Sequence, residues 1–294
     1  MNAPPRFTYF ETLIGFGLAD RRFKRDANYM VMHSYWDESG THGADSPAVI
    51  VAGFAATAAQ WVGFEKRQAK LFSDFGVNTF HAKKLRGNKG DFKDWEPGEK
   101  AKFNYRFLKM IDDQLSFGVA SAVAPEDYKQ HYGQKTFPRK LRRDSQYGLL
   151  FRLALGRSIL FMKERPQSDW PLNVVMELGH PNWQDAARVF NEVKSIPRNS
   201  AMLGTISFAA KSDCALLAVA DSLAYAMFRT TAGYAKHPDN PDAVPIGPSD
   251  PPYYAHVVPT RRVILRKKDL LKFYRDHRDG LVNPRAASSK RRPS

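Results

Sequence analysis

Cysteine and long apolar runs are both scarce in this chain. Because Cys214 is the only cysteine among 294 residues, the chain has no internal disulfide framework and no cysteine-based metal cluster. The longest weakly polar run, residues 48–59, is too short to span a bilayer. The N-terminal residues lack the basic-then-apolar arrangement of a signal peptide. We therefore expect a protein of the reducing cytoplasm with no membrane partner.

Several motifs of catalysis and recognition are also missing. The sequence has no GxSxG element of a serine hydrolase and no glycine-rich phosphate loop of the Walker type. It has no helix-turn-helix, zinc-finger or RNP signature either. These absences argue against serine-hydrolase chemistry, Walker-type nucleotide binding and sequence-specific readout of nucleic acid.

Positive charge is abundant, with a net charge of +15. Residues 261–294 alone contain twelve Lys or Arg and three Asp. Such a segment attracts polyanions through counterion release, which favours nucleic acid as a partner. The alternative is a solvated tail without a binding role.

Shifts in composition divide the chain into four parts. Residues 1–29 predict an N-terminal extension, and residues 30–236 predict the folded domain. Residues 237–284 predict a proline-rich loop followed by a basic C-terminal element. Residues 285–294 predict a disordered basic tail.

The folded part mixes strand-like and helix-like segments without an internal repeat. Apolar runs predict strands at 31–36, 48–56, 115–123, 171–179 and 201–210. Helical spacing predicts helices at 58–74, 97–114, 142–164, 182–194 and 215–228, and residues 78–85 predict a short extended piece. This pattern indicates an α/β domain with an early hairpin and later crossover helices.

The run SYWDESG leads an apolar strand straight into two carboxylates, Asp37 and Glu38. Alternation sends these side chains to opposite faces, so both reach one site only near the strand end, where Gly40 loosens the chain. Alone, this pair is equally typical of an exposed turn. Glu177 ends the apolar strand LNVVMELG and is placed in the same way.

A further acid, Asp221, lies in the apolar helix ALLAVADSLAYAMF. A charged side chain on such a face is unfavourable unless it is paired or bound to a cation. A Lys or Arg partner is the structural alternative. The small neighbours of Asp221 favour close packing on a sheet, which would bring its carboxylate to the strand ends.

Asp37, Glu177 and Asp221 are therefore predicted to meet at one edge of the sheet. Hard cations such as Mg²⁺ or Mn²⁺ prefer oxygen ligands of this kind. Two such ions about 3.5–4 Å apart would activate a water and stabilise the leaving oxygen of a phosphodiester.

Three motifs carry a resemblance to a known family. They are YWDESG at 35–40, FHAKKL at 80–85 and LLAVADSLAYAMFR at 216–229. The chain resembles the domain-of-unknown-function 3800 family (DUF3800), whose members carry Y-x-D-E-S-G, a phenylalanine–histidine pair before a helix, and L-Q-x-A-D-x-x-A-Y. The similarity spans about residues 30–230 and departs at Ala218, where the family has glutamine.

The placing of the acids also resembles the ribonuclease H-like fold. The resemblance implies a mixed central sheet flanked by helices, here with a basic C-terminal extension, and a metal-dependent nuclease. It implies Asp37, Glu177 and Asp221 as metal ligands and Glu38 as a fourth acid. Asp213, just before the last helix, is either a ligand or an N-cap, and capping is favoured.

Three further side chains are candidates near these acids. His81 would deprotonate the attacking water or contact a phosphate, or it is simply hydrogen-bonded. Lys211 would steady a developing negative charge, or it is a solvated lysine. His180 follows Glu177 closely, and a loop histidine is the favoured interpretation.

Two basic groups are predicted to bind nucleic acid through its phosphates. They are Lys83, Lys84, Arg86, Lys89 and Lys93 in a loop after His81, and Arg261, Arg262, Lys267 and Lys268 in the C-terminal element. Phe92 and Trp95 in the loop either stack on an unpaired base or anchor the core.

Two functions of different classes follow. The first is a nuclease that uses Mg²⁺ or Mn²⁺, and the second is a non-catalytic nucleic-acid-binding protein on the same fold. A third, a structural interaction protein, requires that a basic partner neutralise Asp221. The sequence favours neither DNA nor RNA and does not set the oligomeric state.

Overall fold

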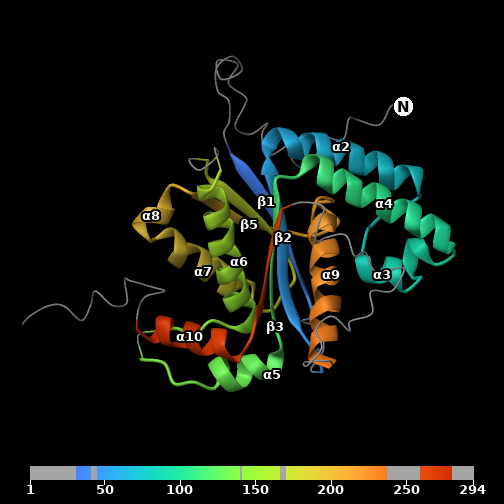
Figure 1. Cartoon of the computed structure of the whole chain (residues 1–294). Helices are drawn as coiled ribbons and strands as arrows, with labels where there is room; N and C mark the ends of the chain where they lie inside the picture. The colour runs from blue at the N-terminus through green and yellow to red at the C-terminus, as the bar shows by residue number, and fades with distance from the viewer. Residues whose placement is uncertain (1–30, 41–44, 140, 166–169, 237–258, 280–294) are drawn as a thin grey trace, which may run out of the picture.

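A six-stranded mixed sheet forms the middle layer of the protein (Figure 1). The computed structural model describes residues 31–40, 45–139, 141–165, 170–236 and 259–279. The strands are β1 (Met32–Ser39), β2 (Val49–Thr57), β3 (Phe117–Val123), β4 (Leu172–Glu177), β5 (Leu203–Ala209) and β6 (Thr260–Leu265), in the order β5-β4-β1-β2-β3-β6. β1, β2 and β3 are antiparallel, whereas β4 is parallel to β1 and β5 is parallel to β4.

The end of β1 depends on a glycine. Gly40 has φ +82°, and a Cβ at this position would lie 1.9 Å from the carbonyl oxygen of Ala48 at the entry to β2. Only glycine tolerates both this conformation and this approach. The predicted loosening of the chain after Glu38 therefore coincides with a backbone conformation that glycine alone adopts freely.

One face of the sheet is covered by helices α2 (Ala58–Asp74), α3 (Ala82–Arg86), α4 (Pro97–Gln114) and α9 (Leu217–Lys236) (Figure 1). A short 3-10 turn, η2 (Gly90–Phe92), lies between α3 and α4. Thr57 starts α2 with a capping box, because its hydroxyl accepts from the Gln60 amide while the Gln60 side chain accepts from the Thr57 amide. Leu217, Val219 and Ala220 of α9 are buried, so this helix packs directly on the sheet.

The other face is covered by α6 (Gln146–Lys163), α7 (Trp183–Lys194), α8 (Pro197–Ser200) and α10 (Lys267–Arg278), with α5 (Pro125–Tyr128) and the π-helical turn η3 (Lys129–Gly133) at its lower end (Figure 1). Trp36 of β1 packs edge-on against Phe151 of α6, with ring centroids 5.7 Å apart. Asp144 and Arg152 form a buried ion pair at 2.6 Å, and Arg188 of α7 also bonds to Asp144 at 2.6 Å. Charge pairing as well as apolar packing therefore joins α6 to α7.

The predicted α/β class, early hairpin and crossover helices are confirmed. The predicted extended piece at 78–85 is wrong in its second half, because residues 82–86 form α3. The basic C-terminal element contains β6, which adds a sixth strand parallel to β3. None of the described helices combines the length and apolar character needed to cross a membrane.

The division of the chain at residues 30 and 236 stays a prediction. The N-terminal extension, the proline-rich stretch 237–258 and the basic tail lie outside the described residues.

Candidate functional site

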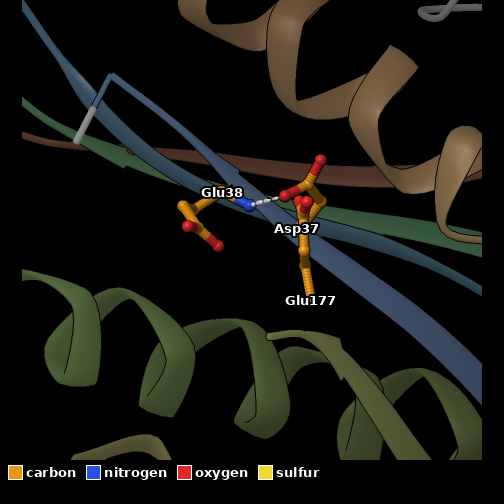
Figure 2. Close-up of side chains that lie close together, drawn as sticks. All are labelled: Asp37, Glu38 and Glu177. Carbon is orange, nitrogen blue, oxygen red and sulfur yellow. Dashed lines mark hydrogen bonds between the residues drawn. The ribbon is translucent and has the colours of Figure 1, made fainter. Parts of the chain in front are cut away.

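Three carboxylates meet at one edge of the sheet. Asp37 and Glu38 lie near the end of β1, and Glu177 is the last residue of β4. Because β1 and β4 are parallel neighbours, their carboxyl ends reach the same edge. One ligand oxygen from each side chain lies within 4.8 Å of the other two. Figure 2 shows the three side chains. We call these residues the carboxylate cluster.

Asp37 and Glu38 leave β1 in different directions (Figure 2). The backbone amide of Glu38 donates to Oδ1 of Asp37 at 2.7 Å, which fixes the Asp37 carboxylate against its own strand. Asp37 is 1% exposed, so only a strong electrostatic partner can hold it ionised. Proximity to the strand end allows the two side chains to share one site despite their alternation.

Lys211 supplies a cation beside Asp37, which lowers the pKa of this carboxyl without reversing the larger effect of its burial. Lys211 follows β5 closely, and its ammonium nitrogen lies 2.9 Å from Asp37, 2.9 Å from Glu177 and 2.8 Å from Asp221. A lysine predicted to steady a developing charge thus sits between three of the predicted acids. Asp221 is not a member of the carboxylate cluster and is joined to it through this ammonium group. The basic partner that the structural interpretation required for Asp221 is therefore present.

The pKa values reflect this crowding of charge. Burial, together with the hydrogen bond to Glu177, raises the pKa of Asp37 well above its usual value. Burial and the charge of Glu177 raise the pKa of Glu38 to about 7. Although burial alone acts in the opposite direction, Asp37 and Lys211 hold the pKa of Glu177 below its usual value. The pKa of Lys211 is raised, because the acids around it outweigh its burial.

Asp221 also holds the FHAKKL segment in place. Its Oδ2 accepts a 2.6 Å hydrogen bond from the amide of Ala82, the first residue of α3. His81 directly precedes this helix, and its Nδ1 lies 4.0 Å from Oδ1 of Asp221. Burial and the positive charge of Lys211 lower the pKa of His81, so its ring is neutral near pH 7. The late helix and the histidine motif are thus linked by a direct contact that sequence spacing alone does not reveal.

The carboxylate cluster suits a hard cation. Oε2 of Glu38 is buried and makes no hydrogen bond, whereas Oδ2 of Asp37 lies 2.9 Å from the ammonium nitrogen of Lys211. Carboxylate oxygens are the ligands that Mg²⁺ and Mn²⁺ prefer. The three acids could therefore hold a divalent metal, and the ammonium group of Lys211 now meets part of the same electrostatic need.

Two other predicted residues are not members of the carboxylate cluster. Asp213 is exposed and accepts a hydrogen bond from Ser212 at 3.0 Å, four residues before α9 begins. His180 is buried, stacks on Tyr147 with ring centroids 4.0 Å apart, and accepts from the Asn182 amide at 3.0 Å. His180 therefore has a packing role in its loop, and a ligand role for Asp213 stays a prediction.

The basic loop after His81 presents charge but no free aromatic ring. Lys83, Lys84, Lys89 and Lys93 are exposed, whereas Arg86 is half-buried. Phe92 is fully buried, and Trp95 packs edge-on against it at 4.9 Å. These two rings pack in the core, and phosphate contact by the basic residues of the loop stays a prediction.

The C-terminal basic residues divide between a strand and a helix. Arg262 on β6 and Lys267 and Lys268 on α10 are exposed. Arg261 is half-buried and pairs with Glu164. Nucleic-acid contact by these residues stays a prediction.

No family model and no curated protein matches the chain. The DUF3800 resemblance therefore rests on the three motifs alone.

Proposed function

We propose that the protein is a divalent-metal-dependent nuclease of the DUF3800 type on a ribonuclease H-like fold. The convergence of Asp37, Glu38 and Glu177 within 4.8 Å at the carboxyl ends of parallel strands carries this proposal. The sheet order, with three antiparallel strands followed by two parallel ones, supports the fold assignment. The net charge of +15 supports a polyanionic substrate.

In this proposal Asp37, Glu38 and Glu177 would hold Mg²⁺ or Mn²⁺. When bound, such an ion supplies Lewis-acid activation of water and neutralises charge on the phosphate. His81, neutral near pH 7, is able to accept a proton from the attacking water. Lys211 would turn toward Asp221 and the substrate, where its charge stabilises the phosphate oxygens.

The placement of Lys211 supports a second function. Its ammonium group lies within 2.9 Å of three acids, so part of their negative charge is already offset without a metal. The protein would then be a non-catalytic nucleic-acid-binding protein in which Lys211 holds β1, β4 and α9 together. The two functions differ in whether the carboxylate cluster binds a metal at all.

Cleavage and calorimetry separate the two functions. Purified wild-type protein is incubated with single- and double-stranded DNA and RNA in Mg²⁺ or Mn²⁺, beside Asp37→Asn and the control Asp74→Asn, an exposed acid on α2. We expect the wild type and Asp74→Asn to bind Mn²⁺ and to cleave, whereas Asp37→Asn loses both properties and still binds nucleic acid. A wild type that neither binds Mn²⁺ nor cleaves any of these polymers would overturn the nuclease and favour the binding protein.

A further inference from the structure

A groove runs along the α6 side of the protein. Two cavities, of about 690 Å³ and about 440 Å³, adjoin there. Both are lined by Tyr128, Arg143, Gln146, Pro181 and Asn182. Because they share this wall, the cavities form one continuous concave surface.

The inner end of the groove lies beside the carboxylate cluster. Gly40, two residues after Glu38, lines the larger cavity together with Tyr147. The hydroxyl of Tyr147 contacts the sulfur of Met176 near the end of β4 at 3.7 Å, and burial together with the charges of Glu38, Asp37 and Glu177 raises the pKa of Tyr147. The groove therefore starts at the sheet edge that carries the acids and continues away from it.

The outer part of the groove is positively charged. Lys129, Arg142 and Arg143 line it and are exposed. Arg139, also exposed, belongs to the loop between η3 and α6 that carries Arg142 and Arg143. Within the described part of the chain, neither Arg139 nor Arg142 forms an ion pair, so their charge is available to a ligand.

Two of the three acids in the groove wall are already neutralised. Asp144 bonds to Arg152 at 2.6 Å, and Asp185 bonds to Arg188 at 2.5 Å. The third, Glu126, lies 4.0 Å from Lys129 in an exposed pair, which offsets the charge of Lys129 only weakly. The wall therefore does not cancel the charge of Arg142 and leaves most of that of Lys129. A polyanion is the ligand that this surface favours.

The loop that carries Arg139, Arg142 and Arg143 is held in position by α10. The ring of Phe137 packs edge-on against Tyr274 of α10, with centroids 5.2 Å apart. The hydroxyl of Tyr274 donates to the carbonyl of Thr136 at 3.0 Å. Arg143 also donates to the carbonyl of Gly133. These contacts fix the loop, so its cations need little further ordering when they bind a ligand.

We propose that this groove binds a single strand of nucleic acid and leads it to the carboxylate cluster, an inference that rests on the proposed nuclease for its catalytic end. Lys129 and Arg142 contact phosphates without reading sequence. The half-buried ring of Tyr128 offers a stacking surface, and Gln146 and Asn182 offer hydrogen bonds to base edges. A duplex keeps its bases stacked inside and cannot use these contacts.

Fluorescence anisotropy in EDTA tests the groove without cleavage. The probe is labelled oligodeoxythymidine, and the variant is Lys129→Glu with Arg142→Glu. The matched control is Lys66→Glu with Lys102→Glu, two exposed lysines on α2 and α4 across the sheet that give the same change of charge. We expect the groove variant to bind at least about tenfold more weakly, with a smaller salt dependence, and the control to stay within about twofold.

Several outcomes would overturn the proposal that the groove binds a single strand. Equal loss in both variants would show that overall charge alone governs binding. Loss confined to Lys83→Glu with Lys84→Glu would place the strand on the opposite face. Duplex binding as tight as strand binding would remove the single-strand assignment. Thermal melting of each variant ensures that only folded protein is compared.

The groove and the nuclease can fail separately. A wild type that binds the strand through Lys129 and Arg142 but never cleaves would contradict the proposed nuclease and support strand binding in the groove. A wild type that cleaves, with a groove variant that binds and cleaves equally well, would contradict strand binding in the groove and support the nuclease.

Discussion

The ammonium nitrogen of Lys211 lies 2.8 Å from Oδ1 of Asp221 and so ties α9 to the end of β5. The same nitrogen lies 2.9 Å from Asp37 and 2.9 Å from Glu177, so one cation serves acids from three segments. A divalent metal in the carboxylate cluster would meet the same electrostatic need. We therefore expect Lys211 and a bound metal to compete.

Lys211→Met removes the charge and keeps most of the apolar stem. In EDTA we expect its free energy of unfolding to fall by about 3 kcal/mol, because removing one partner of a buried ion pair leaves uncompensated charge. In Mn²⁺ we expect calorimetry to show binding about tenfold tighter than in the wild type, a gain of about 1.4 kcal/mol. The control is Lys66→Met, an exposed lysine on α2. Unchanged stability in EDTA would contradict the role of Lys211 as the balancing cation.

Glu177→Gln and Asp221→Asn should differ in their effect on metal binding. Glu177 belongs to the carboxylate cluster, whereas Asp221 is occupied by the Ala82 amide at 2.6 Å and by Lys211. We expect calorimetry to show no Mn²⁺ binding for Glu177→Gln and binding weakened by less than about tenfold for Asp221→Asn. Equal loss in both variants would instead make Asp221 a direct ligand.

Much of the fold could be predicted because its core segments have clear periodicity. The predicted helix 58–74 has the same bounds as α2, since its buried positions recur at helical spacing. β6 was not predicted, because Thr260–Leu265 is a half-exposed edge strand in a run of basic residues. α3 was not predicted from hydrophobic periodicity, because a helix of five residues is too short to show the spacing of apolar positions.

The carboxylate cluster could be predicted only in part. Asp37 and Glu177 stand at the ends of apolar strands, and parallel pairing brings such ends together. The contacts of Lys211 could not be predicted, because a lysine after a strand carries no signal of which acids it will reach. The loop around Arg142 did have a signal, the basic run KTFPRKLRR, but its position along the groove depends on the packing of Phe137 on α10.

Gly40→Ala should destabilise the protein more than Gly76→Ala. Both residues have positive φ, +82° and +65°, so both variants carry the strain of that conformation. Only at Gly40 would the new Cβ meet backbone, 1.9 Å from the Ala48 oxygen, whereas nothing lies within 4 Å at Gly76. We expect losses of about 1 kcal/mol for Gly76→Ala and at least about 3 kcal/mol for Gly40→Ala in urea unfolding. Equal losses would mean that the turn relaxes around the methyl group.

Asp144→Asn should lower the free energy of unfolding by an amount that depends on pH. Although burial alone would raise its pKa, the hydrogen bonds and charges of Arg152 and Arg188 hold the pKa of Asp144 below its usual value. Asp185 and Glu192, the other acids at these arginines, complete the network. Because the folded pKa lies below the unfolded one, the ionised Asp144 adds stability above the unfolded pKa. That stability is lost as the pH falls through the folded pKa.

We therefore expect Asp144→Asn to lower the free energy of unfolding by about 3 kcal/mol at pH 7, since it removes the buried carboxylate from two arginines. The difference in free energy of unfolding between the variant and the wild type should narrow as the pH falls below about 4, because the wild type then loses the charge of Asp144 as well. Urea unfolding followed by tryptophan fluorescence across this range measures both quantities. Asp74→Asn, at an exposed ion pair with Arg106, is the control and should change unfolding little. A gap that stays constant down to pH 3 would show that Asp144 stabilises the fold by shape and hydrogen bonding rather than by its charge.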